Sequence, residues 1–108
     1  MKKDPAVFIN HIIESIALIE RYVGSATKSE YLKNTEMQDA VMRRIEIIGE
    51  ATKCLVEEFK SEHSEIPWRN IAGMRDKLIH EYFGVDLELV WEVVKKDLPE
   101  LKRSLERA

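Results

Sequence analysis

The sequence predicts an all-α protein, an antiparallel four-helix bundle with a short additional C-terminal helix. Apolar residues recur at steps of three and four along most of the 108 residues, and β-branched alternation is scarce. Only four glycines and three prolines interrupt these runs. With 44% hydrophobic and 34% charged residues, the composition is that of a globular chain. We expect one domain over residues 1–108.

The first helix is predicted over residues 5–23. Asp4 can cap its free N–H groups, Pro5 suits the first helical position, and Gly24 is a typical stop. The apolar positions at helical spacing are Val7, Phe8, Ile12, Ile16, Ile19 and Val23. The polar segment 25–34 predicts a connector with room for one helical turn.

A long second helix is predicted over residues 35–62, with Thr35 as its N-cap. Its apolar positions are Met37, Val41, Ile45, Ile48, Ala51, Leu55 and Phe59. Gly49 in mid-helix costs about 1 kcal/mol against alanine, so we interpret it as a point of close helix approach. Cys54, the only cysteine, excludes an intrachain disulfide and a cysteine-based zinc site, and we expect it to fill a buried helix face.

A third helical segment is predicted over residues 68–82, after a break that Pro67 closes. Gly73 can divide it, and Gly84 is expected to end it. Asp86 then suits the N-cap of a fourth helix, and Pro99 the start of the short last helix. The inward residues of these two helices are Leu87, Val90, Trp91, Val94, Leu101 and Leu105.

Metal-binding motifs are not found in the sequence. His11 and Glu14 occur in the reverse of the Glu-x-x-His order that di-iron bundles use. His80 is not followed by a second histidine at the zinc-protease spacing, where Gly84 stands. A Gly-rich phosphate loop is also absent. We therefore expect no metal and no cofactor.

The charged residues favour a solvated surface. Glu46 and Glu50 lie one helical turn apart. Arg43 precedes Glu46 by three residues and Lys53 follows Glu50 by three, a spacing at which ion pairs form on a helix. The net charge of -3 argues against coating nucleic acid by bulk electrostatics, but leaves a local basic site open. Because no apolar run approaches a membrane span or a signal peptide, we expect a cytoplasmic protein without a membrane partner.

The segment RDKLIHEYFG, residues 75–84, is the strongest candidate site. On a continuous helix Asp76 and His80 share a face, so that the carboxylate can orient the imidazole. Arg75 and His80 are five residues apart, about 140° around the helix. They converge if the helix loosens near His80 or if two copies meet at a symmetry axis.

These residue types suit phosphodiester chemistry. The fork of Arg75 can hold a phosphate, and His80 can give or take a proton near neutral pH. Tyr82 can donate a hydrogen bond, stack on a base or be modified, and Arg69 and Lys77 add positive charge. The spacing alone still favours an ordinary helix end, at which histidine interacts with the helix dipole.

The segment resembles the HEPN superfamily, whose signature is Arg-polar-x-x-x-His. With Tyr82 it becomes Arg-x4-His-x-Tyr, the form of HepT-like toxins. The segments RIEIIGEA, IPWRNIAGMRDKLIHEYFGVD and VWEVVKKDLPEL also look like that family, in the same order, and the resemblance covers residues 5–103.

The resemblance implies a helical homodimer that cleaves RNA, with tRNA or mRNA as candidate substrates. It implies a metal-independent ribonuclease toxin with Arg75 and His80 as catalytic residues and Asp76 in support. Its antitoxin would be an MNT-type nucleotidyltransferase that transfers AMP to Tyr82. The alternatives are a non-catalytic HEPN module that binds nucleotides, RNA or a nucleotidyltransferase, and a purely structural helical dimer.

Overall fold

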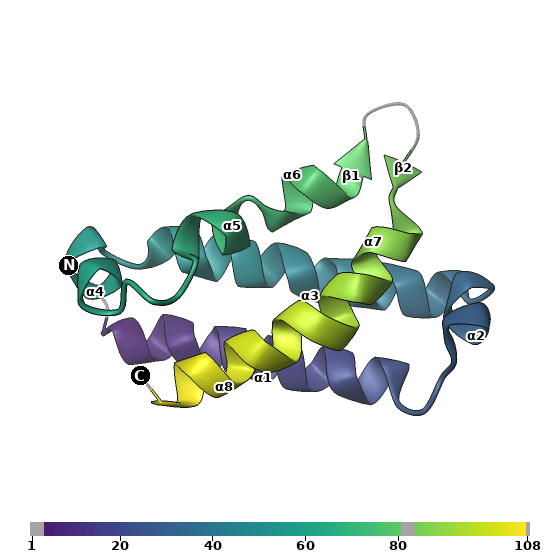
Figure 1. Ribbon diagram of the computed structural model, residues 1–108, viewed down its shortest axis with the longest axis horizontal. Helices are drawn as coiled ribbons and strands as arrows, with labels where there is room; N and C mark the ends of the chain where they lie inside the picture. The colour runs from purple at the N-terminus through teal and green to yellow at the C-terminus, as the bar shows by residue number, and fades with distance from the viewer. Residues whose placement is uncertain (1–3, 81–83, 108) are drawn as a thin grey trace.

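The computed structural model describes residues 4–80 and 84–107, with the backbone alone for His80. This part of the chain is mainly helical, which confirms the all-α class (Figure 1). No helix within it is long and apolar enough to cross a membrane. The elements in order are α1 (Pro5–Val23), α2 (Lys28–Leu32), α3 (Thr35–Cys54), α4 (Glu57–Glu62), α5 (Trp68–Ala72), α6 (Met74–Leu78), β1 (Ile79–His80), β2 (Gly84–Val85), α7 (Leu87–Glu92), the π-helical η1 (Val93–Asp97) and α8 (Leu98–Arg107).

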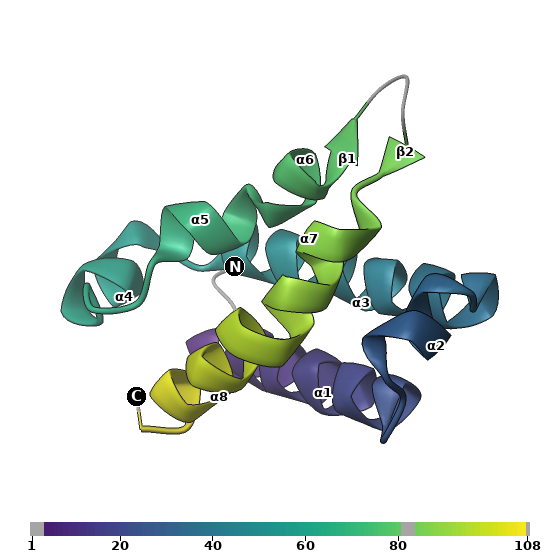
Figure 2. The same ribbon diagram turned by 45° about the vertical axis from the view of Figure 1, so that its right-hand side comes forward.

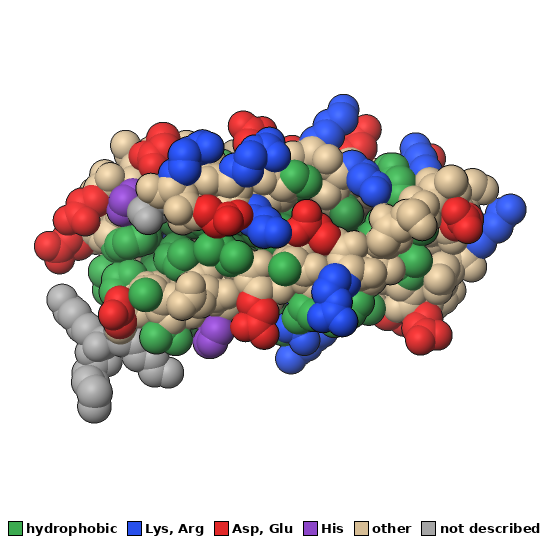
Figure 3. All heavy atoms as spheres, turned by 90° about the horizontal axis from the view of Figure 1, so that it is seen from below, with side chains coloured by type: hydrophobic (Ala, Val, Ile, Leu, Met, Phe, Trp, Pro, Cys, Tyr) green, Lys and Arg blue, Asp and Glu red, His purple; other side chains and the backbone are tan. Residues whose placement is uncertain are grey.

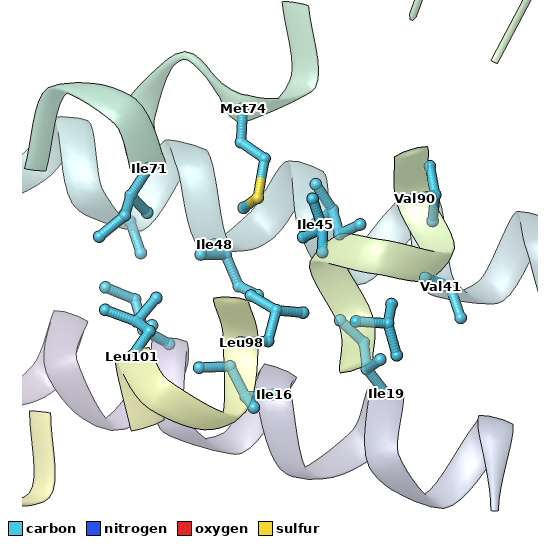
Figure 4. Close-up of a cluster of buried hydrophobic side chains, with 14 of the residues drawn as sticks. Ile16, Ile19, Val41, Ile45, Ile48, Ile71, Met74, Val90, Leu98 and Leu101 are labelled. Carbon is cyan, nitrogen blue, oxygen red and sulfur yellow. The ribbon is translucent and has the colours of Figure 1, made fainter. Parts of the chain in front are cut away.

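The long helices α1 and α3 run antiparallel and form the centre of the molecule (Figure 1). Helix α8 packs on α1, whereas α5 and α6 pack on α3 (Figure 2). Apolar side chains from all these helices and from α7 point toward one another (Figure 4). The buried side chains labelled there are Ile16, Ile19, Val41, Ile45, Ile48, Ile71, Met74, Val90, Leu98 and Leu101.

Helix α1 begins and ends where the sequence predicted. The Asp4 side chain accepts a hydrogen bond from the Ala6 N–H at 2.9 Å, and Pro5 is the first helical residue. Gly24 follows the last residue with a φ of +53°, which glycine adopts without a Cβ penalty. Local signals therefore set the two ends of this helix.

Helix α2 ties the first connector to the start of α7. It begins with a capping box, in which Thr27 and Glu30 each bond the other's backbone N–H. Tyr31 is fully buried, and its hydroxyl donates to the Leu87 carbonyl at 3.0 Å. Its ring lies 5.1 Å from that of Trp91, centroid to centroid. The sequence predicted the helical turn here, but not this link.

Because of Tyr31, the stability of the folded protein should fall at alkaline pH. Burial, with a smaller contribution from the Asp86 carboxylate, raises the pKa of Tyr31 from 10.0 to about 12. The unfolded chain therefore releases this proton at a lower pH than the native protein. Its contribution to stability is present below pH 10.0 and is lost as the pH rises toward about 12. Urea denaturation across this range should show a steeper fall for wild type than for Tyr31→Phe, and parallel curves would contradict it.

The helix predicted over residues 35–62 is in fact two helices, because the chain leaves the helical conformation at residues 55 and 56. Helix α3 ends at Cys54, and Leu55 is extended with a ψ of 136°. The break keeps Leu55 buried and redirects the chain, so that the Phe59 ring in α4 packs 6.1 Å from that of Trp68. Cys54 is exposed, so its expected role as a buried filler is also wrong. The last buried residue of α3 is Thr52, two residues before Cys54.

Gly49 is a point of close helix approach, as predicted. A Cβ at this position would lie 3.4 Å from the Ala72 carbonyl oxygen and 3.7 Å from that of Ile71. The backbone of α5 thus passes directly over α3. This contact helps to place α5, and after it α6, against the long helix.

Gly49→Val should lower the free energy of unfolding by about 1–3 kcal/mol, because its branched methyl groups would press on the backbone of α5. Gly49→Ala is the matched control. The alanine Cβ would just touch the Ala72 carbonyl oxygen. Alanine also favours a helix over glycine by about 1 kcal/mol, which offsets the cost of this close contact. Urea denaturation measures both variants. Equal stability of the two would show that α5 can move away freely.

The last two predicted helices form one continuous helix. Pro99 lies inside α8 instead of starting a separate helix, and the π-helical segment η1 precedes it. The Leu98 N–H donates to the Val93 carbonyl, five residues back. In an ordinary α-helix the ring of Pro99 clashes with the carbonyl four residues back, and the wider turn of η1 lies just before it.

Candidate functional site around Arg75 and His80

The helix that was predicted to continue to residue 82 ends at Leu78. Gly73 divides it into α5 and α6, as expected. After α6 the chain becomes a short antiparallel hairpin in which Ile79 pairs with Val85 and His80 with Gly84. The Asp86 N–H closes the hairpin by donating to the Leu78 carbonyl at 2.7 Å. Pairing across the hairpin replaces the helical hydrogen bonds and ends the helix.

The hairpin changes the geometry of the motif. Asp76 and His80 were expected to share one helix face, and this is wrong because α6 ends between them. The helix does give way near His80, which was one of the two conditions for Arg75 and His80 to converge. The His80 side chain and Tyr82 lie outside the described residues, so their roles stay predictions.

The guanidinium of Arg75 is accessible. Its side chain is 50% exposed, and Nη1 lies 3.5 Å from Oδ1 of Asp76, whose side chain is 80% exposed. An ion pair this long between exposed groups contributes little, so it holds Arg75 only weakly. Asp76 therefore neighbours Arg75, and the arginine remains available to a phosphate.

The other two predicted basic residues lie apart from Arg75. Arg69 on α5 lines a shallow depression with Lys60 and Glu57. Lys77 on α6 lines a cavity of about 360 Å³ between α5–α6 and η1–α8. The acidic residues of that cavity are Glu65, Asp97 and Glu100. The structure does not gather these two basic side chains with Arg75, and their contacts with RNA stay predictions.

Arg75 instead lines a groove of about 490 Å³ with residues of α1 and α3. The other lining residues are Phe8, His11, Arg43, Glu46, Ile47, Glu50, Ala51 and Cys54. The Glu50 carboxylate lies 3.3 Å from the Lys53 ammonium, as predicted, but among the described residues the other expected pair, Arg43 with Glu46, does not form. Sequence reasoning did not connect this face with Arg75. No spacing signal could have done so, because tertiary packing brings three separate helices together.

Away from this groove, the surface carries both acidic and basic side chains. On the face formed by α1 and α8, acidic and basic side chains alternate around an apolar area near one end (Figure 3). This face therefore offers no broad positive field for a polyanion. Within residues 4–80 and 84–107, no three histidine, cysteine or acidic side chains gather as a metal-binding group.

Comparisons with known proteins agree on one family. The family model described as Ribonuclease HepT-like matches residues 12–108. "Probable ribonuclease HepT" of Thermococcus cleftensis is 46% identical, over 99% of this chain and 97% of that protein. "Putative RNase TTE0752" of Caldanaerobacter subterraneus subsp. tengcongensis is 42% identical, over 95% of this chain and 92% of that protein.

A longer relative carries a second activity in its name. "Gamma-glutamylcyclotransferase and putative RNase MJ0434" of Methanocaldococcus jannaschii is 54% identical over 97% of this chain, which spans 47% of that protein. No solved structure gives a significant match. The family match over most of the chain, together with near full-length relatives, shows that this chain belongs to the HepT-like ribonuclease family.

Proposed function

We propose that this chain is a metal-independent endoribonuclease toxin of a toxin–antitoxin pair that acts in the cytoplasm. Membership of the HepT-like ribonuclease family is the observation that carries the proposal. The accessible guanidinium of Arg75, close in the chain to the hairpin that bears His80, supports it. Among RNAs, tRNA and mRNA are the candidate substrates.

The proposed reaction is attack of a ribose 2′-OH on the adjacent phosphate. One His80 takes the 2′-OH proton while the new O–P bond forms. The bond to the 5′-oxygen breaks, and that oxygen takes a proton from a second His80. The products are a 2′,3′-cyclic phosphate end and a free 5′-OH. Arg75 stabilises the charge that grows on the phosphate oxygens.

A homodimer supplies the second histidine. One chain has a single motif histidine, whereas this reaction benefits from both a base and an acid. Two chains related by a symmetry axis can place both His80 residues and both Arg75 residues around one phosphate. Arg75 lies at the surface and can face a second copy. When wild type is mixed with an inactive His80→Ala chain, dimers of one chain of each kind form and lack one histidine. The RNA-cleaving activity should then fall by more than dilution with buffer lowers it.

The proposed antitoxin is an MNT-type nucleotidyltransferase that transfers AMP from ATP to the Tyr82 oxygen and releases pyrophosphate. Tyr82 is two residues from His80. A nucleotide there would add bulk and a negative charge that competes with RNA for Arg75. A Tyr82→Phe protein that is still inactivated by AMP transfer would contradict this role.

The decisive experiment is incubation of the protein with total RNA, tRNA and DNA of matched length, with and without EDTA. We expect RNA to be cut in both buffers and DNA to stay intact, since DNA lacks the 2′-OH. Mass spectrometry should find cyclic phosphate ends. Cleavage that EDTA abolishes, or equal cleavage of DNA, would contradict the mechanism.

The second candidate is a non-catalytic module that binds nucleotides, RNA or a nucleotidyltransferase. The net charge of -3 favours it modestly, because an RNA-cutting protein gains from positive charge. Binding of RNA or of the nucleotidyltransferase, without cleavage under any condition above, would establish this candidate in place of the nuclease.

A further inference from the structure

We propose that the groove beside Arg75 binds one unpaired nucleotide of the RNA, next to the bond that is cut. Arg43 would hold its phosphate, and Phe8 would stack on its base. The inference rests on the proposed function, because Arg75 is taken to hold the scissile phosphate. Arg75 and Arg43 line the same groove, and they would hold two neighbouring phosphates of one strand.

Arg43 is a free cation in this groove. It is exposed, and within the described part of the chain it has no hydrogen bond or ion pair. His11, exposed on α1, lines the same groove and adds a second donor. A guanidinium presents a planar fork that matches two phosphate oxygens. An unengaged arginine of this kind loses no existing partner when a phosphate binds.

Phe8 supplies the aromatic surface. It is partly buried and packs against the hydrophobic core, while it also lines the groove. Its packing against the core limits the movement of the ring, and the part that lines the groove can contact a ligand. Ile47 and Ala51 extend the apolar lining. An aromatic ring beside an arginine is the combination on which single-stranded nucleic acids stack and bind.

The two carboxylates in the groove limit what can bind there. Glu50 is paired with Lys53, whereas Glu46 is partly buried and lines the groove. A carboxylate repels phosphate but accepts hydrogen bonds from the amino groups of bases. The groove therefore suits a nucleotide with its base turned inward better than a bare run of phosphates. A base that stacks and bonds in this way must be unpaired.

Cys54 makes the groove directly testable. It is the only cysteine, it is exposed, and it lines the groove. A 2′-O-methyl RNA oligonucleotide lacks the attacking hydroxyl, so it binds without being cut. We expect the saturating oligonucleotide to slow the reaction of Cys54 with N-ethylmaleimide about tenfold. Mass spectrometry of the labelled protein over time measures the rate. Unchanged labelling with the oligonucleotide bound would overturn the proposal.

Two pairs of variants test the contacts by fluorescence anisotropy with the same oligonucleotide. Arg43→Ala should weaken binding about tenfold and lower the salt slope by about 0.7, one phosphate contact on a single strand. Arg103→Ala, exposed on α8 away from the groove, should do neither. Phe8→Leu should weaken binding at least about fivefold, and Phe8→Tyr should retain it. Equal affinities across either pair would overturn the assignment.

The same measurements separate the competing outcomes. If a second copy of the chain covers the groove, Cys54 labelling will slow as protein concentration rises without RNA, and the proposal fails. If RNA is cut normally by Arg43→Ala with unchanged KM, the groove is not a subsite although the nuclease stands. If the oligonucleotide protects Cys54 but no RNA is ever cut, the nucleotide site stands and the proposed catalysis fails.

Discussion

Replacing His80 with alanine is expected to lower the rate of RNA cleavage by at least about 100-fold. A positioned acid–base group contributes about 10²–10⁴-fold, and in a shared site the change removes the base and the acid together. His80→Gln should be equally inactive, because an amide can hydrogen-bond but cannot titrate. The rate is measured at neutral pH with an RNA oligonucleotide of defined sequence.

The matched control is His63→Gln. His63 lies between α4 and α5 with its ring 4.6 Å from that of Phe59, away from the motif. We expect it to leave cleavage unchanged. Circular dichroism of each variant checks that the helices are retained, since the His80 backbone pairs with Gly84 in the hairpin. A folded His80→Ala protein with near wild-type activity would exclude this residue from catalysis.

Ile48→Ala should lower the free energy of unfolding by about 2–5 kcal/mol. Ile48 is fully buried on α3 and lies among side chains of α1 and α8, close to Ile16 and Leu98 in Figure 4. Removing three carbon atoms there leaves a cavity, and the three packed helices cannot all move inward to fill it. Urea denaturation by circular dichroism measures the loss.

Val56→Ala provides the comparison on an exposed site. Val56 is 37% exposed in the break between α3 and α4, so its truncation should change stability by no more than about 0.5 kcal/mol. A loss for Ile48→Ala as small as this would mean that the core tolerates or refills the cavity.

Local sequence signals predicted much of the helical structure. The Asp4 cap, Pro5 and Gly24 set the bounds of α1, and Gly49 marked the approach of α5. These signals succeed because capping and helix periodicity depend on residues within one or two turns of each other. The family resemblance, read from the motif and three neighbouring segments, was confirmed by the comparisons.

Gly84 shows where local reasoning failed. The sequence marked it as a helix stop, and it does have a positive φ of 75°. That conformation serves the hairpin, six residues beyond the real end of α6. A glycine signals that the backbone can turn, but which structure uses the turn depends on pairing between Ile79 and Val85. The misplacement mattered because it put His80 on a helix.

By itself the sequence determined the helical class, most of the core-facing positions and the identity of the motif, because each depends on residue type and short-range spacing. Only the tertiary structure decided which side chains meet. It buried Tyr31 against α7, left Cys54 exposed, and placed Arg75 in one groove with Phe8 and Arg43. Contacts between helices depend on how their surfaces fit together, and no spacing along the chain records that fit.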